Sequence, residues 1–356
     1  MASFALAAPV FARNSARQRL EAAPGGARAT MEGPPPDAAG DSSGEGFDSG
    51  PPPILPEPPK GSIAWVMKGM LRTIRPHQWV KNLFVLAPLV FAKHLTHESV
   101  LISAVGGFAV FCVLAGAVYT LNDLVDVEAD RVHPVKRKRP IASGQVPIPL
   151  AKGMVVGLLA IAMIGASLGP PLFAGAAALY FALNLAYSFK LKKIAYLDVG
   201  LISFFFVLRV LAGGFAIRTP VSWYMVACTA LLALFLGFGK RRHELAGANA
   251  AKQRAALESY SPRVLTVALS VTGLASVGTY LAYTLDPATR AFFGSEWLWL
   301  TTIHPVFGVV RFLQLVRGRP KSESPTQEML RDVPFVMNVS LWVVEIIAIV
   351  YRLRPS

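Results

Sequence analysis

Apolar runs long enough to cross a bilayer dominate this chain of 356 residues. A helix needs about 17–25 mostly apolar residues to span the hydrocarbon core, where only helices and closed barrels satisfy the backbone. Charged residues make up 16% of the chain, against about 25% in soluble domains. The sequence therefore predicts an all-α fold, a polytopic membrane bundle of nine transmembrane helices. The nine runs lie at roughly residues 79–95, 99–121, 149–168, 171–189, 195–217, 221–239, 264–285, 297–316 and 335–353.

Residues 1–60 differ in kind from the rest. They are rich in Pro, Ala, Gly and Ser and show no apolar periodicity, so we expect a disordered extension. An over-long start, with Met31 as the true first residue, is the alternative. Residues 61–356 form the predicted catalytic domain. It opens with an amphipathic helix between Ile63 and Pro76, expected to lie in the membrane interface.

The positive charge is concentrated in loops. A net charge of +14 in a soluble protein favours nucleic-acid binding. Here the Lys and Arg residues precede the first apolar run and follow the second, fourth, sixth and eighth, which places them on one side of a nine-span alternation. Positive loops stay cytoplasmic, so we expect a cytoplasmic N-terminus, a membrane setting and no nucleic-acid partner.

Three carboxylates follow the second run, at Asp123, Asp126 and Asp130. On a helix they fall within about 60° of one another, and such a stripe repels itself unless a cation sits among its members. Mg²⁺ takes oxygen ligands of this kind and shares them with phosphorylated substrates. The three residues are the predicted metal ligands and catalytic residues, with Mg²⁺ as the cofactor. A solvated connector is the alternative interpretation.

Arg209 lies in the middle of the fifth run, where a charged side chain is costly and marks a functional site by default. It follows Asp198 by eleven residues, which places both on nearly the same helix face. We expect Arg209 to face the substrate cavity. Pairing with Glu345, another charge in mid-run, is the alternative.

The motif around the carboxylates resembles a known family. It reads Asn122-Asp-x-x-Asp-x-x-x-Asp-Arg131, then Lys136-x-x-Arg-Pro-Ile-Ala-Ser-Gly144, and is similar to the first aspartate motif of the UbiA superfamily of intramembrane prenyltransferases. The resemblance covers about residues 72–353. It implies a nine-helix bundle with its active site in a cytoplasm-facing cavity, consistent with the spans derived above.

A second element of that family, Tyr-x-x-x-Leu-Lys with a downstream Asp, recurs here at Tyr187, Lys192 and Asp198. The resemblance implies that these side chains face the phosphates and the metal. A positive loop with a charge at a helix start is the alternative.

The loop after the sixth run distinguishes branches of the family. Quinone-type members carry a second Asp-x-x-x-Asp motif there, whereas this chain has Gly237-Phe-Gly-Lys-Arg-Arg-His-Glu-Leu245. Fixed cations in place of carboxylates suit a substrate with an additional phosphate. The alternative is that these cations only keep the loop on the cytoplasmic side of the membrane. With Arg75-Pro-x-Gln-Trp-x-Lys-Asn82, the pattern resembles the decaprenyl-phosphate phosphoribosyltransferases.

That branch implies transfer of 5-phosphoribose from phosphoribosyl pyrophosphate (PRPP) to a polyprenyl, decaprenyl-type phosphate. Diphosphate is released, and the product serves synthesis of arabinofuranose donors for the cell wall. The implied location is the bacterial inner membrane, with the active site facing the cytoplasm. The residues expected to contact substrate are Lys81, Asn122, Arg131, Lys136, Arg139, Tyr187, Lys192, Asp198, Arg209, Lys240, Arg241 and Glu244.

Two alternative functions account for part of the sequence. An aromatic or quinone polyprenyltransferase would use a prenyl diphosphate with the same first motif, and the missing second motif counts against it. A membrane transporter or lipid-binding protein without chemistry would leave the carboxylates and cations on one face unexplained, and the chain has no visible inverted repeat.

Overall fold

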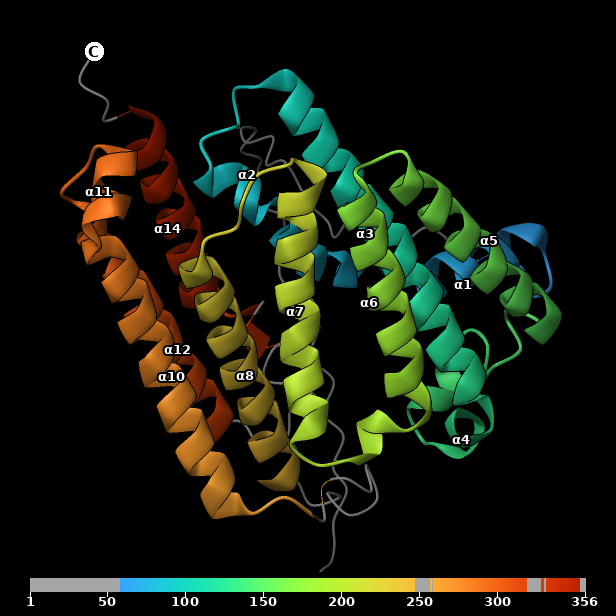
Figure 1. Ribbon diagram of the computed structural model, residues 1–356. Coiled ribbons are helices and arrows are strands. Elements are labelled where there is room, and N and C mark those ends of the chain that lie inside the picture. Colours follow the sequence, from blue (N-terminus) through green and yellow to red (C-terminus); the bar gives the residue numbers. More distant parts are fainter. Residues whose placement is uncertain (1–57, 247–256, 258, 319–327, 330, 353–356) are drawn as a thin grey trace, which may run out of the picture. The chain divides into compact units, whose positions relative to one another are not determined.

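The computed structural model describes residues 58–246, 257, 259–318, 328–329 and 331–352, and every regular element within these ranges is a helix (Figure 1). The predicted all-α fold is confirmed. Of the predicted extension 1–60, residues 1–57 lie outside the described residues. Its disorder therefore stays a prediction.

Eight helices in the described part of the chain are long and apolar enough to cross a membrane. They agree with the second to ninth predicted runs, so the chain is a multi-pass membrane protein. Proline sets several of their starts, as at Pro171 and Pro262, because its missing N–H is not needed in the first turn. The helices are α3 Glu98–Val125, α5 Ile148–Ser167, α6 Pro171–Phe189, α7 Leu197–Ala216, α8 Trp223–Ala246, α10 Pro262–Leu285, α12 Ile303–Gly318 preceded by the 3₁₀ turn η5 Leu298–Thr302, and α14 Val333–Arg352.

The first predicted run, 79–95, is not a continuous α-helix. It forms the 3₁₀ helix η1, Pro76–Leu86, and the short helix α2, Ala87–Phe91. Pro88 cannot donate a backbone hydrogen bond inside this run, which favours a break near the junction. The count of nine transmembrane helices is therefore not confirmed.

This irregular segment nevertheless runs antiparallel to α3. Asn82 near its middle donates from Nδ2 to the carbonyl of Phe111 at 3.3 Å, and Leu89 near its end shares a buried cluster with Ala104. Since its start lies beside Asp123, as described below, the segment follows α3 for about 28 Å at the usual helical rise. That length is close to the thickness of a bilayer core, about 30 Å.

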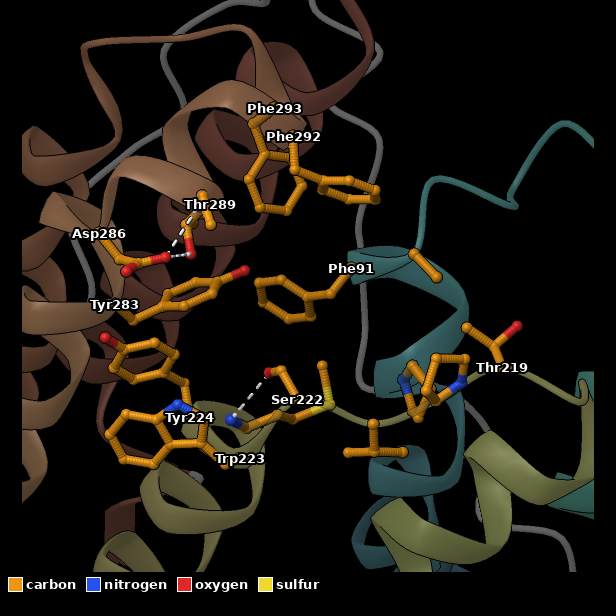
Figure 2. Close-up of a pocket in the computed structure, with 16 residues that line it drawn as sticks. Phe91, Thr219, Ser222, Trp223, Tyr224, Tyr283, Asp286, Thr289, Phe292 and Phe293 are labelled. Atoms are coloured by element: carbon orange, nitrogen blue, oxygen red, sulfur yellow. Dashed lines mark hydrogen bonds between the residues drawn. The ribbon is translucent and has the colours of Figure 1, made fainter.

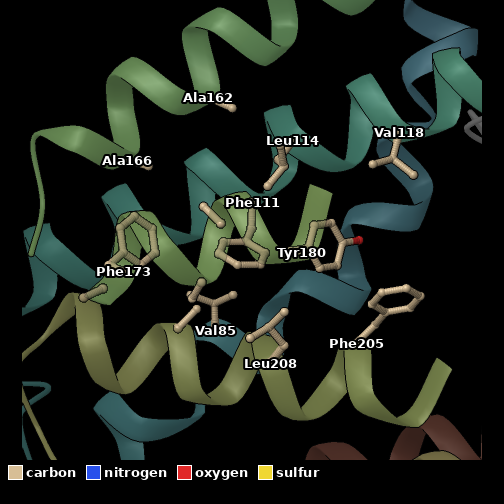
Figure 3. Packing of buried hydrophobic residues seen from close by; sticks show 14 residues of the cluster. Val85, Phe111, Leu114, Val118, Ala162, Ala166, Phe173, Tyr180, Phe205 and Leu208 are labelled. Carbon is tan, nitrogen blue, oxygen red and sulfur yellow. The ribbon is translucent and has the colours of Figure 1, made fainter. Parts of the chain in front are cut away.

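The main buried cluster joins α3, α5, α6 and α7 (Figure 3). Its aromatic members Phe111, Phe173, Tyr180 and Phe205 pack at angles to one another, with ring centroids 5.3–6.0 Å apart. Small residues let the backbones approach closely, most tightly at Gly213 of α7. A Cβ there would lie 2.0 Å from the carbonyl oxygen of Val85, so η1 packs directly on the α7 backbone.

Before η1 lies α1, Ile63–Ile74, which begins where the sequence predicts. The hydroxyl of Ser62 accepts a hydrogen bond from the N–H of Trp65 at 3.2 Å and so caps the helix. Arg75 ends it in the left-handed conformation, with φ of 53°. Its location in the membrane interface stays a prediction.

Candidate active site

The polar residues predicted for the site meet at one end of the bundle. The end of α3 joins the end of α6 through the hydrogen bond that Ser188 Oγ donates to Asn122 Oδ1. The same Oγ lies 2.7 Å from the carbonyl oxygen of Asn184 on α6, so the single hydroxyl proton is shared between these two acceptors. Asn122 is therefore held by a partner, Ser188, that the sequence analysis missed.

Asp123 lies between two guanidinium groups. Its Oδ1 is 2.5 Å from Arg75 Nη2 and 3.2 Å from Arg139 Nη1, and the carboxylate is almost fully buried. Arg139 also reaches Asp130 Oδ2 at 2.6 Å, so one arginine joins two of the three predicted carboxylates. Arg75 was not among the predicted site residues, although it opens the Arg-Pro-x-Gln-Trp motif. Its guanidinium also lies over the Tyr119 ring, 5.2 Å from the centroid.

Asp126 faces a different partner. It interrupts the helix between α3 and α4, Val127–Val132, with φ of −92° and ψ of 7°. Its carboxylate oxygens accept hydrogen bonds from Lys192 Nζ at 2.9 and 3.1 Å. Asp126 therefore pairs with the turn after α6, whereas Arg139 pairs with Asp123 and Asp130, so the three predicted carboxylates do not share one cation.

The acidic side chains suit a metal ion whose ligands come partly from the substrate, rather than one held by protein ligands alone. Within the described residues, no group of three His, Cys, Asp and Glu side chains converges to hold a metal ion. Mg²⁺ usually takes one or two carboxylates and completes its shell with water and substrate phosphates. The buried carboxylates Asp123 and Asp130 and the nearby Asp126 offer oxygen donors of that kind, each now neutralised by a cation.

Two predicted cations lie at the edge of this group. Arg131 pairs with Glu128 at 2.8 Å on the exposed side of α4 and does not join the carboxylates. Lys136 begins the short 3₁₀ turn η2, Lys136–Lys138, and its backbone N–H donates to His133 Nδ1 at 3.2 Å.

Asp198 and Arg241 form a buried ion pair with each other, and their contact with substrate stays a prediction. Arg241 Nε lies 3.0 Å from Asp198 Oδ2, and the two side chains are 2% and 0% exposed. Tyr260, which the sequence analysis missed, donates its hydroxyl to Asp198 Oδ1. Burial and this bond raise the pKa of Tyr260, so its hydroxyl stays a donor near neutral pH.

Glu244 links this pair to Lys240. It accepts a hydrogen bond from Arg241 Nη1, while its other oxygen lies 3.9 Å from Lys240 Nζ. Lys81 of η1 lies within range of the positive charges of Lys240, Arg209 and Arg75. Lys81 and Lys240 thus bring positive charge from η1 and α8 to one region.

Arg209 is buried and hydrogen-bonds to polar neighbours, so its predicted orientation toward a substrate cavity stays a prediction. Its Nε donates to Asn82 Oδ1 at 2.8 Å and its Nη2 to the Tyr180 hydroxyl at 2.6 Å. The alternative pairing with Glu345 is wrong, because Glu345 lies 2.8 Å from His304 Nε2 instead. Arg209 therefore fastens η1 to α6 and α7.

Tyr187 completes the set of predicted residues. Its ring contacts Phe205 edge-on at 6.0 Å, and its phenol lies within electrostatic range of Arg241. The structure thus places Tyr187 between the main buried cluster and the buried ion pair.

A separate cavity of about 420 Å³ lies at the opposite end of the bundle (Figure 2). It is enclosed by α2, the start of α8, the end of α10 and the short helix α11, Pro287–Phe293. Aromatic side chains dominate its lining, among them Phe91, Tyr224 and Tyr283. None of the predicted site residues lines it.

Comparison with known proteins identifies the family. The model of the UbiA prenyltransferase family matches residues 83–337. This chain belongs to the UbiA prenyltransferase family. Among UbiA-family relatives, it is 34% identical over 304 residues to the decaprenyl-phosphate phosphoribosyltransferase of Corynebacterium glutamicum, which covers 83% of this chain and 89% of that protein. It is 35% identical over 309 residues to the protein of the same name from Mycolicibacterium smegmatis, covering 83% and 95%.

Solved structures support the UbiA fold. A UbiA homolog from Archaeoglobus fulgidus bound to DMAPP and Mg²⁺ superposes with a TM-score of 0.60 at 19% sequence identity, over 80% of this chain and all of that one. At this identity the likeness concerns the fold. Both the UbiA resemblance and the resemblance to its phosphoribosyltransferase branch are confirmed.

Proposed function

We propose that this UbiA-family protein transfers 5-phosphoribose from PRPP to a polyprenyl phosphate of the decaprenyl type and releases diphosphate. The observation that carries the proposal is the similarity to relatives named decaprenyl-phosphate phosphoribosyltransferase over most of both chains. The described site adds support, because it combines acidic groups for a metal with cations for several phosphates.

Asp123, Asp126 and Asp130 are the proposed Mg²⁺ ligands. Mg²⁺ bound there would neutralise the charge that develops on the departing diphosphate. That a UbiA homolog has been solved with Mg²⁺ supports the same role here. The diphosphate brings its own oxygens to complete the coordination shell.

Arg75, Arg139 and Lys192 are proposed to change partners when PRPP binds. In the structure each of these cations neutralises a carboxylate, at 2.5–3.2 Å. With a metal on the carboxylates, these cations would be free to bind diphosphate oxygens, which guanidinium groups hold in a bidentate manner. The exchange keeps the buried carboxylates compensated in both states.

Lys81 and Lys240 are proposed to receive the other phosphates, the 5-phosphate of PRPP and the phosphate of the lipid acceptor. Both lysines are partly buried. The acceptor is already an anion, so attack on the anomeric carbon requires no general base. As the C–O bond to diphosphate breaks, the new bond forms from the lipid phosphate oxygen, and preorganised cations stabilise the leaving charge.

The location of the protein follows from the same proposal. Cationic loops after α3, α6 and α8 favour a cytoplasmic site, where PRPP is soluble, and the bundle lies in the bacterial inner membrane. A role in supplying arabinofuranose donors for the cell wall follows from the product.

One assay tests the proposal. Purified protein with Mg²⁺, a polyprenyl phosphate and ribose-labelled PRPP should yield an acid-labile, lipid-linked phosphoribose. A parallel reaction supplies a labelled prenyl diphosphate and an aromatic acceptor. A labelled product in that reaction, with none from labelled PRPP, would replace this function by aromatic prenyl transfer.

A further inference from the structure

The helix α1 has an outer apolar face that contacts no other part of the described chain closely. Ile63, Met67 and Leu71 follow one another at four-residue spacing and are 82%, 58% and 58% exposed. They lie within about 80° of one another around the helix axis. The exposed cations Lys60 and Arg72 flank this face along the chain. An apolar stripe flanked by cations is the pattern of a helix that lies on an anionic bilayer surface.

The inner face of α1 is fastened to a loop, residues 139–146. Gln145 Nε2 donates to the carbonyl of Trp65 at 2.7 Å. A Cβ on Gly69 would lie 2.7 Å from Gln145 Cγ, so the loop rests directly on the α1 backbone. Met70 adds an apolar contact to the buried cluster that contains Val146.

This loop also carries one of the two guanidinium groups on Asp123. The N–H of Ser143 donates to the carbonyl of Arg139 at 2.9 Å, and the N–H of Val146 donates to that of Pro140 at 2.9 Å. Because these turns close the loop on itself, Gln145 and Arg139 belong to one compact unit. A shift of α1 at Gln145 is therefore carried to Arg139.

The second guanidinium is attached to α1 directly. Arg75 is the residue that ends the helix, in the left-handed conformation that is uncommon for a non-glycine residue. Its Nη2 contacts Asp123 Oδ1 at 2.5 Å. Both cations on Asp123 are thus set by the position of one surface helix.

We propose that α1 docks on the anionic headgroup surface of the bilayer at the Asp123 end of the bundle, and that this docking holds Arg75 and Arg139 in place for the diphosphate of PRPP. The inference rests on the proposed function. The partner is a lipid surface, because a soluble protein partner would not match an apolar stripe on a chain that already lies in the membrane. Each of Lys60 and Arg72 is expected to strengthen docking on anionic lipid about fivefold.

The test uses the full chain in nanodiscs of phosphatidylcholine, with or without phosphatidylglycerol. An environment-sensitive fluorophore on Met67→Cys reports docking without reference to activity, and wild type treated with the same fluorophore corrects for labelling of Cys112 and Cys228. In the anionic discs we expect the fluorophore emission to indicate a more apolar environment, and we expect a lower KM for PRPP. The Lys60→Gln, Arg72→Gln double variant should lose both differences, whereas Arg263→Gln, an exposed cation at the start of α10, should keep them.

A second variant separates docking from its effect on the site. Gln145→Ala removes one hydrogen bond between α1 and the loop, so KM for PRPP should rise about fivefold while the probe signal stays unchanged. Equal probe signals in the two discs would overturn docking, and an unchanged KM in Gln145→Ala would overturn the coupling. Absence of phosphoribosyl transfer in every disc, with the probe difference intact, would instead refute the proposed function.

Discussion

Removing Arg241 should destabilise the fold far more than it weakens substrate binding. Arg241 and Asp198 are 2% and 0% exposed and lie 3.0 Å apart. Breaking a buried pair by removing one partner costs about 3–5 kcal/mol, because the other charge is left uncompensated. Arg241→Gln should lower the free energy of unfolding by that amount. Tyr260 still donates to Asp198 but cannot supply a countercharge.

The double variant Asp198→Asn, Arg241→Gln sharpens the prediction. It deletes both charges of the buried pair, so part of the lost free energy should return and the coupling in the double-mutant cycle should reach about 2–3 kcal/mol, while the loss of the Arg241 contact to Glu244 remains in both variants. Unfolding in mixed micelles, followed by circular dichroism, measures the stability. Arg242→Gln, the neighbouring partly exposed cation, serves as the control.

The kinetics of the same variants decide between two roles. If Arg241 only holds the end of α8 in place, the folded fraction of Arg241→Gln keeps a KM for PRPP within a few-fold of wild type. Unchanged stability together with a large rise in KM would refute the reasoning, and would return Arg241 to the substrate-binding role that the sequence predicts.

Two further outcomes follow from local contacts. Lys192→Ala leaves Asp126 without its cation and should lower kcat/KM for PRPP at least tenfold, about 1.4 kcal/mol, while exposed Lys190→Ala should change it less than twofold in the same assay. Gly213→Ala should lower the melting temperature, since the new Cβ lies 2.0 Å from Val85 O and overpacking costs about 1–3 kcal/mol. Gly200→Ala in the same helix meets no atom within 4 Å and should not destabilise the protein.

The sequence predicts the long helices well because a bilayer leaves the backbone few choices. Apolar length alone located the second to ninth runs. It failed in the first run, where 3₁₀ geometry and the short helix α2 follow from Pro88 and from packing against Gly213. Such packing depends on residues far away in the chain, which a window of hydropathy does not contain.

The site was predictable in composition and less so in pairing. The spacing of Asp123, Asp126 and Asp130 predicts the acidic character of the site, but it does not show that Lys192 pairs with Asp126 while Arg139 pairs with the other two. Arg75 and Tyr260 come from distant segments, so only the fold brings them to Asp123 and Asp198.

Burial also decides between roles that the sequence leaves open. Charge order along the end of α8 does not reveal that Arg241 points inward while Lys240 stays partly exposed. Likewise, the mid-helix charge of Arg209 is visible in the sequence, whereas its hydrogen bonds to Asn82 and Tyr180 require the path of η1.

The most direct test of the central claim is single-turnover transfer of labelled phosphoribose to polyprenyl phosphate, as a function of Mg²⁺ concentration, in wild type and Asp123→Asn. We predict a Mg²⁺-dependent lipid product from the wild type and a loss of at least a hundredfold in rate in the variant, with exposed Lys190→Ala as a folded control. Transfer at near-normal rate by Asp123→Asn, or without Mg²⁺, would contradict the account.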